Sequence, residues 1–271
     1  MRPGMREEAM QGTYAEIYRA WRDDPDGYWA ELARDIDWFT PPSRIFNGDD
    51  GVYGRWFPDA AGNTCHNCVD RHVAAGRGDT TALIYDSPVT GRKACYSYEA
   101  LLAQVNAMAA VFADAGVAKG DRVIVYMPMI PEAIFAMLAC ARIGAIHSVV
   151  FGGFAASELA ARIDDSAAKL VVTASCGVEP NRVVAYKPLL DAAIDLARNK
   201  PERCLVLQRP ELAADLVPGR DVDLGQALSA AAGRMVPCAA LAAKPPKTTE
   251  WIAPMRAQAS MAKIASGIIG M

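Results

Sequence analysis

The chain has 271 residues, of which 52% are hydrophobic and 22% are charged. This composition is ordinary for a soluble globular protein and excludes general disorder, and the length is enough for one large domain or two small ones with a substantial core. The formal net charge of -3 supplies no overall positive field, so we expect no nucleic-acid partner.

The cysteine content and the N-terminus indicate a reduced, cytoplasmic protein. The seven cysteines are odd in number and scattered, which does not suggest a disulfide framework. Charged residues at positions 2, 6, 7 and 8 interrupt any secretory apolar segment. No apolar run is long enough to cross a bilayer, so we expect no membrane partner.

Residues 14–60 are rich in tyrosine, tryptophan and phenylalanine, and prolines interrupt any long helix there. We predict helices over 14–21 and 27–36, followed by an extended segment. Aromatic side chains dominate core burial, so we expect these to act as buried anchors. We assign residues 1–75 to an N-terminal helical and extended arm.

Beyond residue 80, short apolar runs alternate with amphipathic segments. The apolar runs predict strands over 81–85, 122–127, 145–150, 169–173 and 204–207. The segments between them predict helices over 98–112, 131–142, 155–165 and 189–197. We therefore predict an α/β fold with a doubly wound, mostly parallel sheet and helices on both faces. Ligands of such sheets bind beyond the carboxyl ends of the strands.

The end of the chain has a different character. We assign residues 76–238 to the α/β domain and residues 239–271 to a divergent tail. Residues 208–250 are rich in Ala, Pro and Asp, with weak periodicity. Apolar residues between 261 and 269 fall on one helical face, which could pack on the domain or stay exposed.

The Cys-His-Asn-Cys run at 65–68, with His72 four residues later, raises the question of a zinc or redox site. A structural zinc needs four ligands, usually as two spaced pairs, and no second pair follows. A redox CxxC opens a helix after a strand, which this run does not do. We expect instead a polar, hydrogen-bonded corner made of Asn67, Asp70, Arg71 and His72.

The Phe-Gly-Gly-Phe run at 151–154 lies between a predicted strand and a predicted helix. Free backbone N–H groups and the helix dipole suit a phosphate at such a junction, and glycines permit a close approach. A tight strand-to-helix turn explains the same residues equally well. Arg182 and Lys187 follow a predicted strand at the expected ligand edge, where they could contact phosphate or form a solvated surface pair.

These stretches together resemble the N-terminal portion of short-chain acyl-CoA synthetases, within the adenylate-forming superfamily. The resemblance covers residues 14–238, and residues 179–190 look closest to propionyl-CoA synthetases, ahead of acetyl-CoA synthetases. The other matching stretches are 38–42, 56–57, 67–72, 120–123, 126–132, 139–145, 147–154 and 158–163. The resemblance implies that the chain holds only part of the full family fold.

The resemblance also implies a CoA-binding role for two segments. The residues that carry it are Phe151, Gly152, Gly153, Glu179, Pro180, Asn181 and Arg182. Acetate-specific relatives have an arginine at the position of Glu179, so one charge contact to CoA differs. No catalytic residue and no metal ligand is assigned within this chain.

The family joins an acid such as propionate or acetate to CoA in two steps, through an acyl-adenylate, with release of AMP and pyrophosphate. The family uses Mg²⁺, a Tyr-Thr-Ser-Gly-Thr-Thr-Gly loop and a C-terminal lysine for the first step. The loop should follow Cys238, where the chain instead reads Ala239-Ala240-Leu241. We therefore expect a truncated or frameshifted synthetase that is inactive alone, with the main ATP and Mg²⁺ site absent.

Two other hypotheses stay open. The chain could be a non-catalytic module that binds CoA or a partner subunit. It could also be a non-functional remnant whose incomplete sheet leaves apolar surface exposed. The sequence does not indicate an oligomeric state.

Overall fold

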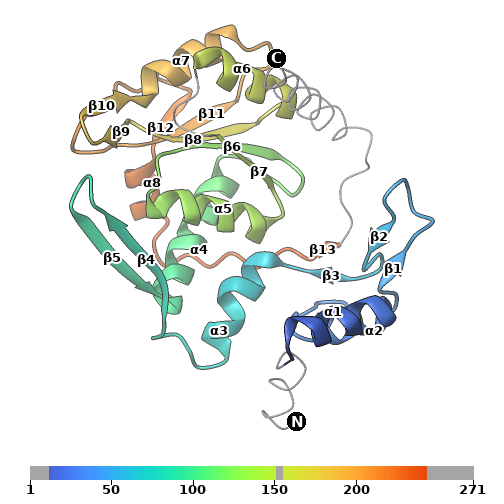
Figure 1. The fold of residues 1–271 in the computed structure, drawn as a ribbon. Coiled ribbons are helices and arrows are strands. Elements are labelled where there is room, and N and C mark those ends of the chain that lie inside the picture. Colours follow the sequence, from blue (N-terminus) through green and yellow to red (C-terminus); the bar gives the residue numbers. More distant parts are fainter. Residues whose placement is uncertain (1–11, 151–154, 243–271) are drawn as a thin grey trace, which may run out of the picture. The chain divides into compact units, whose positions relative to one another are not determined.

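The structure is a computed structural model that describes residues 12–150 and 155–242. The described residues form two compact units (Figure 1). The first contains the residues up to 62 together with 240–242, and the second contains residues 63–239. Among the helices in these ranges, none is long and apolar enough to cross a membrane.

The first unit combines two helices with short antiparallel strand pairs. Its elements are α1 (Tyr14–Asp23), α2 (Pro25–Ala33), β1 (Phe46–Asn47), β2 (Arg55–Trp56), β3 (Ala61–Gly62) and β13 (Leu241–Ala242). The chain begins α1 with a capping box between Thr13 and Glu16. Strand β1 pairs with β2, and β13 pairs with β3.

The expected burial of the aromatic residues was wrong, since every tyrosine, tryptophan and phenylalanine of residues 14–60 keeps part of its surface exposed, although several rings pack on one another. Trp56 contacts the rings of Trp29 and Phe46, with centroids 5.4 and 4.8 Å apart. In contrast, α1 contains no buried residue, and Tyr14 is 81% exposed. The prediction was wrong for α1 because its tyrosines stack mainly on one another, with the Tyr14 and Tyr18 centroids 6.0 Å apart.

The second unit is an α/β domain built on a parallel sheet. Its elements are η3 (His66–Asp70, a π-helix), α3 (Arg71–Ala74), β4 (Thr81–Ser87), β5 (Arg92–Ser97), α4 (Tyr98–Asp114), β6 (Arg122–Tyr126), α5 (Pro131–Ile143), β7 (Ile146–Val149), α6 (Ala156–Ser166), β8 (Leu170–Ala174), β9 (Cys176–Glu179), β10 (Arg182–Ala185), α7 (Tyr186–Leu196), β11 (Arg203–Leu207), β12 (Asp221–Asp223) and α8 (Leu224–Ala230). The strand order is β12-β11-β8-β6-β7, and every neighbouring pair is parallel. This arrangement confirms the predicted α/β fold.

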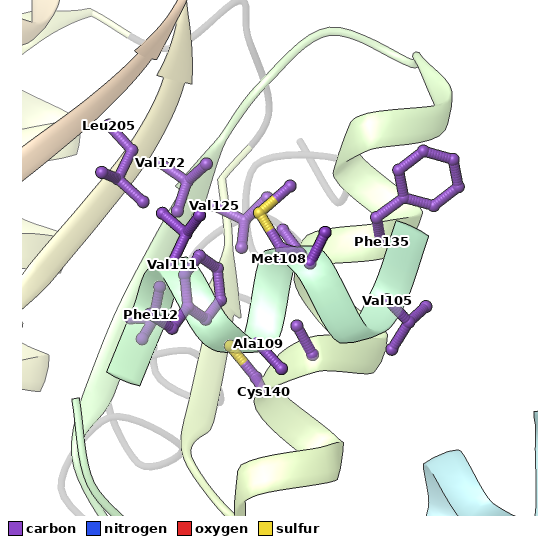
Figure 2. Close-up of a cluster of buried hydrophobic side chains, with 14 of the residues drawn as sticks. Val105, Met108, Ala109, Val111, Phe112, Val125, Phe135, Cys140, Val172 and Leu205 are labelled. Atoms are coloured by element: carbon purple, nitrogen blue, oxygen red, sulfur yellow. The ribbon is translucent and has the colours of Figure 1, made fainter. Parts of the chain in front are cut away.

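Each face of the sheet packs against its own helices because successive side chains of a strand point to opposite faces. Val125, Val172 and Leu205 pack in one cluster with side chains of α4 and α5 (Figure 2). Their neighbours in β6 and β8, Ile124 and Val171, pack in a second cluster with side chains of α6 and α7. The sheet is therefore buried on both faces, as expected for parallel strands.

Local capping signals explain where the helices of this domain begin and end. The Ser97 hydroxyl accepts a hydrogen bond from the N–H of Ala100 at 3.2 Å, which caps α4. Gly116 and Gly144 follow α4 and α5 with φ of 83° and 79°, a conformation that favours glycine. Seven elements of this domain were not predicted: η3, α3, β5, β9, β10, β12 and α8.

A buried ion-pair network joins α7 to β12. The Lys187 ammonium lies 2.8 Å from the carboxylate of Asp221 and 2.7 Å from that of Asp191, and the Asp221 side chain is fully buried. Burial opposes ionisation of Asp221, but hydrogen bonds from Arg220 and Lys187 hold its pKa below the usual range. Lys187 is itself buried, so both predictions for it, a ligand contact and a solvated surface pair, were wrong.

We predict that Lys187→Met lowers the free energy of unfolding by about 3 kcal/mol, because it leaves the buried Asp221 carboxylate with less compensation. Urea unfolding measures this change. Lys93→Met is the matched control, since Lys93 pairs with Asp86 at the surface. It should change the free energy by less than about 0.5 kcal/mol. Equal losses for the two variants would contradict the prediction.

Candidate functional site

A cavity of about 620 Å³ lies at the carboxyl end of the parallel sheet. Its wall combines the loop after β6, the end of β7, strand β9, the start of α7 and the turn between β4 and β5. This is the edge at which open α/β sheets bind ligands. Met129, Val149 and Val178 provide apolar wall, and Glu179 and Arg209 provide charge.

Arg209 is a buried cation that lines this cavity and also a neighbouring one of about 370 Å³. Its guanidinium donates to the carbonyl of Cys176 at 3.0 Å and lies 3.6 Å from the carboxylate of Glu211. Its backbone N–H donates to the Ser175 hydroxyl at 2.9 Å. These contacts fix a positive charge beside the cavity, a role that the sequence analysis missed.

Tyr186 forms part of the cavity wall and is held in place from two sides. Its ring stacks on that of Tyr126, with centroids 4.9 Å apart and planes 23° apart. It also lies over Gly177, where an added Cβ would meet the Tyr186 ring at 2.6 Å. Burial raises the pKa of Tyr186, and it raises that of Tyr126 to about 12, so both phenols are neutral at physiological pH. Gly177 is therefore required for this packing.

The β9–β10 hairpin presents an ion pair at the rim of the cavity. Glu179 and Arg182 are register partners on either side of the turn at Pro180 and Asn181. The Arg182 Nε donates to the Glu179 carboxylate at 2.7 Å, and this hydrogen bond lowers the pKa of Glu179. Arg182 is exposed, so an incoming anion would compete with Glu179 for it.

The structure brings part of the predicted CoA-binding set to the cavity. Glu179 lines it, whereas Pro180, Asn181 and Arg182 are exposed at the hairpin tip. The remaining predicted residues, Phe151, Gly152 and Gly153, lie outside the described residues. Val149 and Val150, which directly precede them, line the cavity. The CoA-binding role of all seven stays a prediction.

The expected polar corner after residue 62 is confirmed for two of its members. Asn67 donates to the carbonyl of Asn63 at 3.1 Å and accepts from Arg71 at 3.2 Å. Asp70 instead binds the buried Arg142 through both carboxylate oxygens, at 2.8 and 2.9 Å. His72 forms a hydrogen bond with Arg77, and its ring packs at a tilt against that of Tyr98, with centroids 4.5 Å apart.

The zinc-like spacing of Cys65, Cys68 and His72 does not gather these three side chains. Cys65 is buried, and Cys68 is exposed. Within residues 12–150 and 155–242, the one group of three ligand-type atoms consists of Cys65, Asp70 and Cys238, all within 4.8 Å of one another. The sequence analysis did not connect Cys238 with this corner because it lies far along the chain.

Comparisons with known proteins match nearly the whole described chain to one family. The AMP-binding enzyme family matches residues 70–252, and the acetyl-coenzyme A synthetase N-terminus matches residues 14–68. The chain is 46% identical over 219 residues to human acyl-CoA synthetase short-chain family member 3, mitochondrial, covering 80% of this chain and 32% of that protein. It is 42% identical over 227 residues to the Escherichia coli propionate–CoA ligase, covering 84% of this chain and 36% of the ligase.

A solved structure shows the same fold. Acetoacetyl-CoA synthetase from Streptomyces lividans superposes with a TM-score of 0.72 at 23% sequence identity, over 86% of this chain and 35% of that one. The acetyl-coenzyme A synthetase of Xanthobacter autotrophicus is 45% identical over 214 residues, which are 77% of this chain and 32% of that enzyme. The chain thus spans about a third of the length of these relatives.

We predict that Gly177→Ala destabilises the domain by about 1–3 kcal/mol, because the added methyl group forces Tyr186 away from Tyr126. Urea unfolding gives the energy, and near-ultraviolet circular dichroism reports the loss of the tyrosine stack. Gly78→Ala serves as the control, since its Cβ would meet nothing closer than 3.6 Å. An unchanged tyrosine signal in Gly177→Ala would refute the assigned packing.

Proposed function

The chain belongs to the AMP-binding enzyme family, and from this membership we propose that it is the N-terminal part of an AMP-forming acid–CoA ligase. The proposed reaction converts a short-chain acid, ATP and CoA into acyl-CoA, AMP and pyrophosphate. Propionate is the favoured acid and acetate the second candidate. Similarity to the propionate–CoA ligase and to the acetyl-coenzyme A synthetase supports this pair.

The observation that carries the proposal is the exposed Arg182, paired with Glu179 on the hairpin beside the cavity. CoA combines a phosphorylated nucleotide with a long arm that ends in a thiol. A guanidinium suits the phosphates, and Arg182 stands exposed at the rim where they could reach it. The apolar wall formed by Met129, Val149 and Val178 suits the arm. Glu179 must give up Arg182 as the phosphates bind.

The same residues do not supply the adenylation step. That step needs stabilisation of charge on the ATP phosphates, which Mg²⁺ and a phosphate loop provide in such ligases. Mg²⁺ prefers oxygen ligands in octahedral geometry. In the described ranges the one three-ligand group is Cys65, Asp70 and Cys238, whose two thiols do not fit it. We assign ATP and Mg²⁺ to the complete ligase and derive no step through them.

We predict that the purified chain does not catalyse exchange of pyrophosphate into ATP with propionate or with acetate. The reason is that it spans about a third of the relatives' length and carries no phosphate loop of the expected sequence. The Escherichia coli propionate–CoA ligase, assayed in parallel, is the positive control. Exchange above background by the chain alone would overturn the assignment of adenylation to residues outside it.

A second prediction tests CoA binding by calorimetric titration at fixed salt. Arg182→Gln should weaken CoA binding by about tenfold, since it removes a charged hydrogen bond to phosphate. Glu179→Gln should strengthen it by about threefold, since the competing surface ion pair is lost. Arg198→Gln is the control, because Arg198 forms an exposed ion pair with Asp164, remote from the cavity.

The two assays separate the leading proposal from its rival. A non-catalytic module that binds CoA is the second candidate, since the proposed contacts of the hairpin and the cavity wall with CoA do not depend on adenylation. CoA binding that is weaker in Arg182→Gln and stronger in Glu179→Gln supports the CoA site, which both candidate functions share. If CoA at millimolar concentration does not bind, or if the three variants bind equally, the hairpin is not a CoA site.

A further inference from the structure

The segment formed by residues 235–239, called the strap below, is held to the α/β domain by buried polar side chains. The Asn106 side chain accepts a hydrogen bond from the N–H of Val236 at 3.0 Å. Arg142 donates to the carbonyl of the same residue. Asn63 donates to the carbonyl of the last strap residue at 2.8 Å. The strap therefore has a defined position, although it contains no helix or strand.

Cys238 of the strap lies beside Cys65, which immediately precedes η3. Both sulfur atoms approach the same oxygen of Asp70, at 3.7 Å for Cys238 and 3.9 Å for Cys65. The two sulfurs and this oxygen all lie within 4.8 Å of one another. Cys65 is fully buried, whereas Cys238 is half-buried and can be reached by a small reagent.

Arg142 makes this group a poor cation site. Its side chain is 3% exposed, and its guanidinium donates to both oxygens of Asp70 and lies 3.6 Å from the sulfur of Cys65. A metal ion would meet this fixed positive charge at two of its three ligands. A structural zinc also needs a fourth ligand. The charge of Asp70 is already balanced by Arg142.

The positive charge of Arg142 favours thiol chemistry at this pair of cysteines. A hydrogen bond from Cys238, together with Arg142, lowers the pKa of Cys65 despite its burial. The hydrogen bond between Cys238 and Cys65, together with burial, raises the pKa of Cys238. These shifts favour the thiolate form at Cys65 over the thiolate form at Cys238.

We propose that Cys65 and Cys238 form a thiol–disulfide modification site whose co-reactant is a low-molecular-weight disulfide. Cys238, the more accessible of the two, loses its proton to solvent and attacks one sulfur of the reagent, which forms a mixed disulfide and releases one thiolate. Cys65 then loses its own proton and attacks the Cys238 sulfur, which forms the protein disulfide and releases the second thiolate. The two cysteines are oxidised by two electrons, and the reagent is reduced to two thiols.

The bridge would change how the strap is held. In the reduced protein the strap is fixed by hydrogen bonds to Asn63, Asn106 and Arg142, each of which can open with local motion. In the oxidised protein a covalent bond would tie it to the residue before η3. The geometry indicates that Cys65 pairs with Cys238 and not with the neighbouring Cys68.

The test equilibrates the full 271-residue chain with mixtures of reduced and oxidised glutathione under native conditions. Acid quenching, alkylation of free thiols and peptide mass mapping then locate every bridge. We expect a linked pair of peptides that contain Cys65 and Cys238, formed reversibly with the glutathione ratio. Exposed Cys68 and Cys95 should stay open to alkylation once glutathione adducts are removed by brief, mild reduction.

Two variants complete the experiment. Cys68→Ser should keep the bridge, because Cys68 lies outside the pair, whereas Cys238→Ser should abolish it and leave Cys65 unlinked. Since Cys238 is half-buried, its variant is less disruptive than a change at Cys65, and circular dichroism checks that it folds. The proposal is overturned if Cys65 links to Cys68, if no bridge forms at any glutathione ratio, or if the bridge appears only after denaturation.

Discussion

Strand β8 (Leu170–Ala174) is buried along its whole length, and the rest of the α/β domain depends on this burial. Its two edges pair with β6 and β11, and its two faces contact different helix layers. A strand covered on every side cannot shift its register without exposing apolar side chains. The hairpin that begins at Cys176 directly follows it. The cavity wall therefore takes its position from a rigid element.

Two buried ion pairs attach short segments, which the sheet and helices do not hold by themselves, to the helices that pack on this sheet. Lys187 of α7 ties the short strand β12 through Asp221, and Arg142 of α5 ties η3 through Asp70. In each case a cation from a long helix meets a carboxylate from a short, irregular segment. Such pairs add little net stability compared with apolar packing, but an unpaired buried charge is costly. They therefore discriminate strongly against alternative placements of those segments.

The sequence predicted the elements whose pattern is local. Continuous apolar runs identified the central strands, and Ser97 and Gly144 marked helix ends correctly. The half-exposed hairpin strands β5, β9 and β10 carry mixed polar and apolar residues, so no periodic signal distinguished them. Strand β12 was hidden because acidic residues flank a single valine, and Asp221 finds its buried partner, Lys187, only in the folded chain.

In the candidate site, too, the features with a local sequence signal were predicted, and those that depend on tertiary contacts were not. Its location at the carboxyl edge and the residues Glu179 and Arg182 came from motif and position, but their mutual ion pair depends on the hairpin register. Arg209 could have been flagged, because it closely follows the apolar run of β11 at the ligand edge. Lys187 could not, because only the tertiary fold brings Asp221 to it. The pairing of Cys65 with Cys238 is invisible for the same reason.

The division of aromatic residues between the two units has an optical consequence. Within residues 12–150 and 155–242, all the tryptophans, Trp21, Trp29, Trp38 and Trp56, belong to the first unit. The described part of the α/β domain absorbs in the near ultraviolet through tyrosines such as Tyr126 and Tyr186. Indole emission from these four rings therefore reports on the first unit, whereas stacked phenols occur in both units. In a chain whose fifth tryptophan, Trp251, is replaced by phenylalanine, the change in this emission on heating reports the unfolding of the first unit separately from that of the α/β domain.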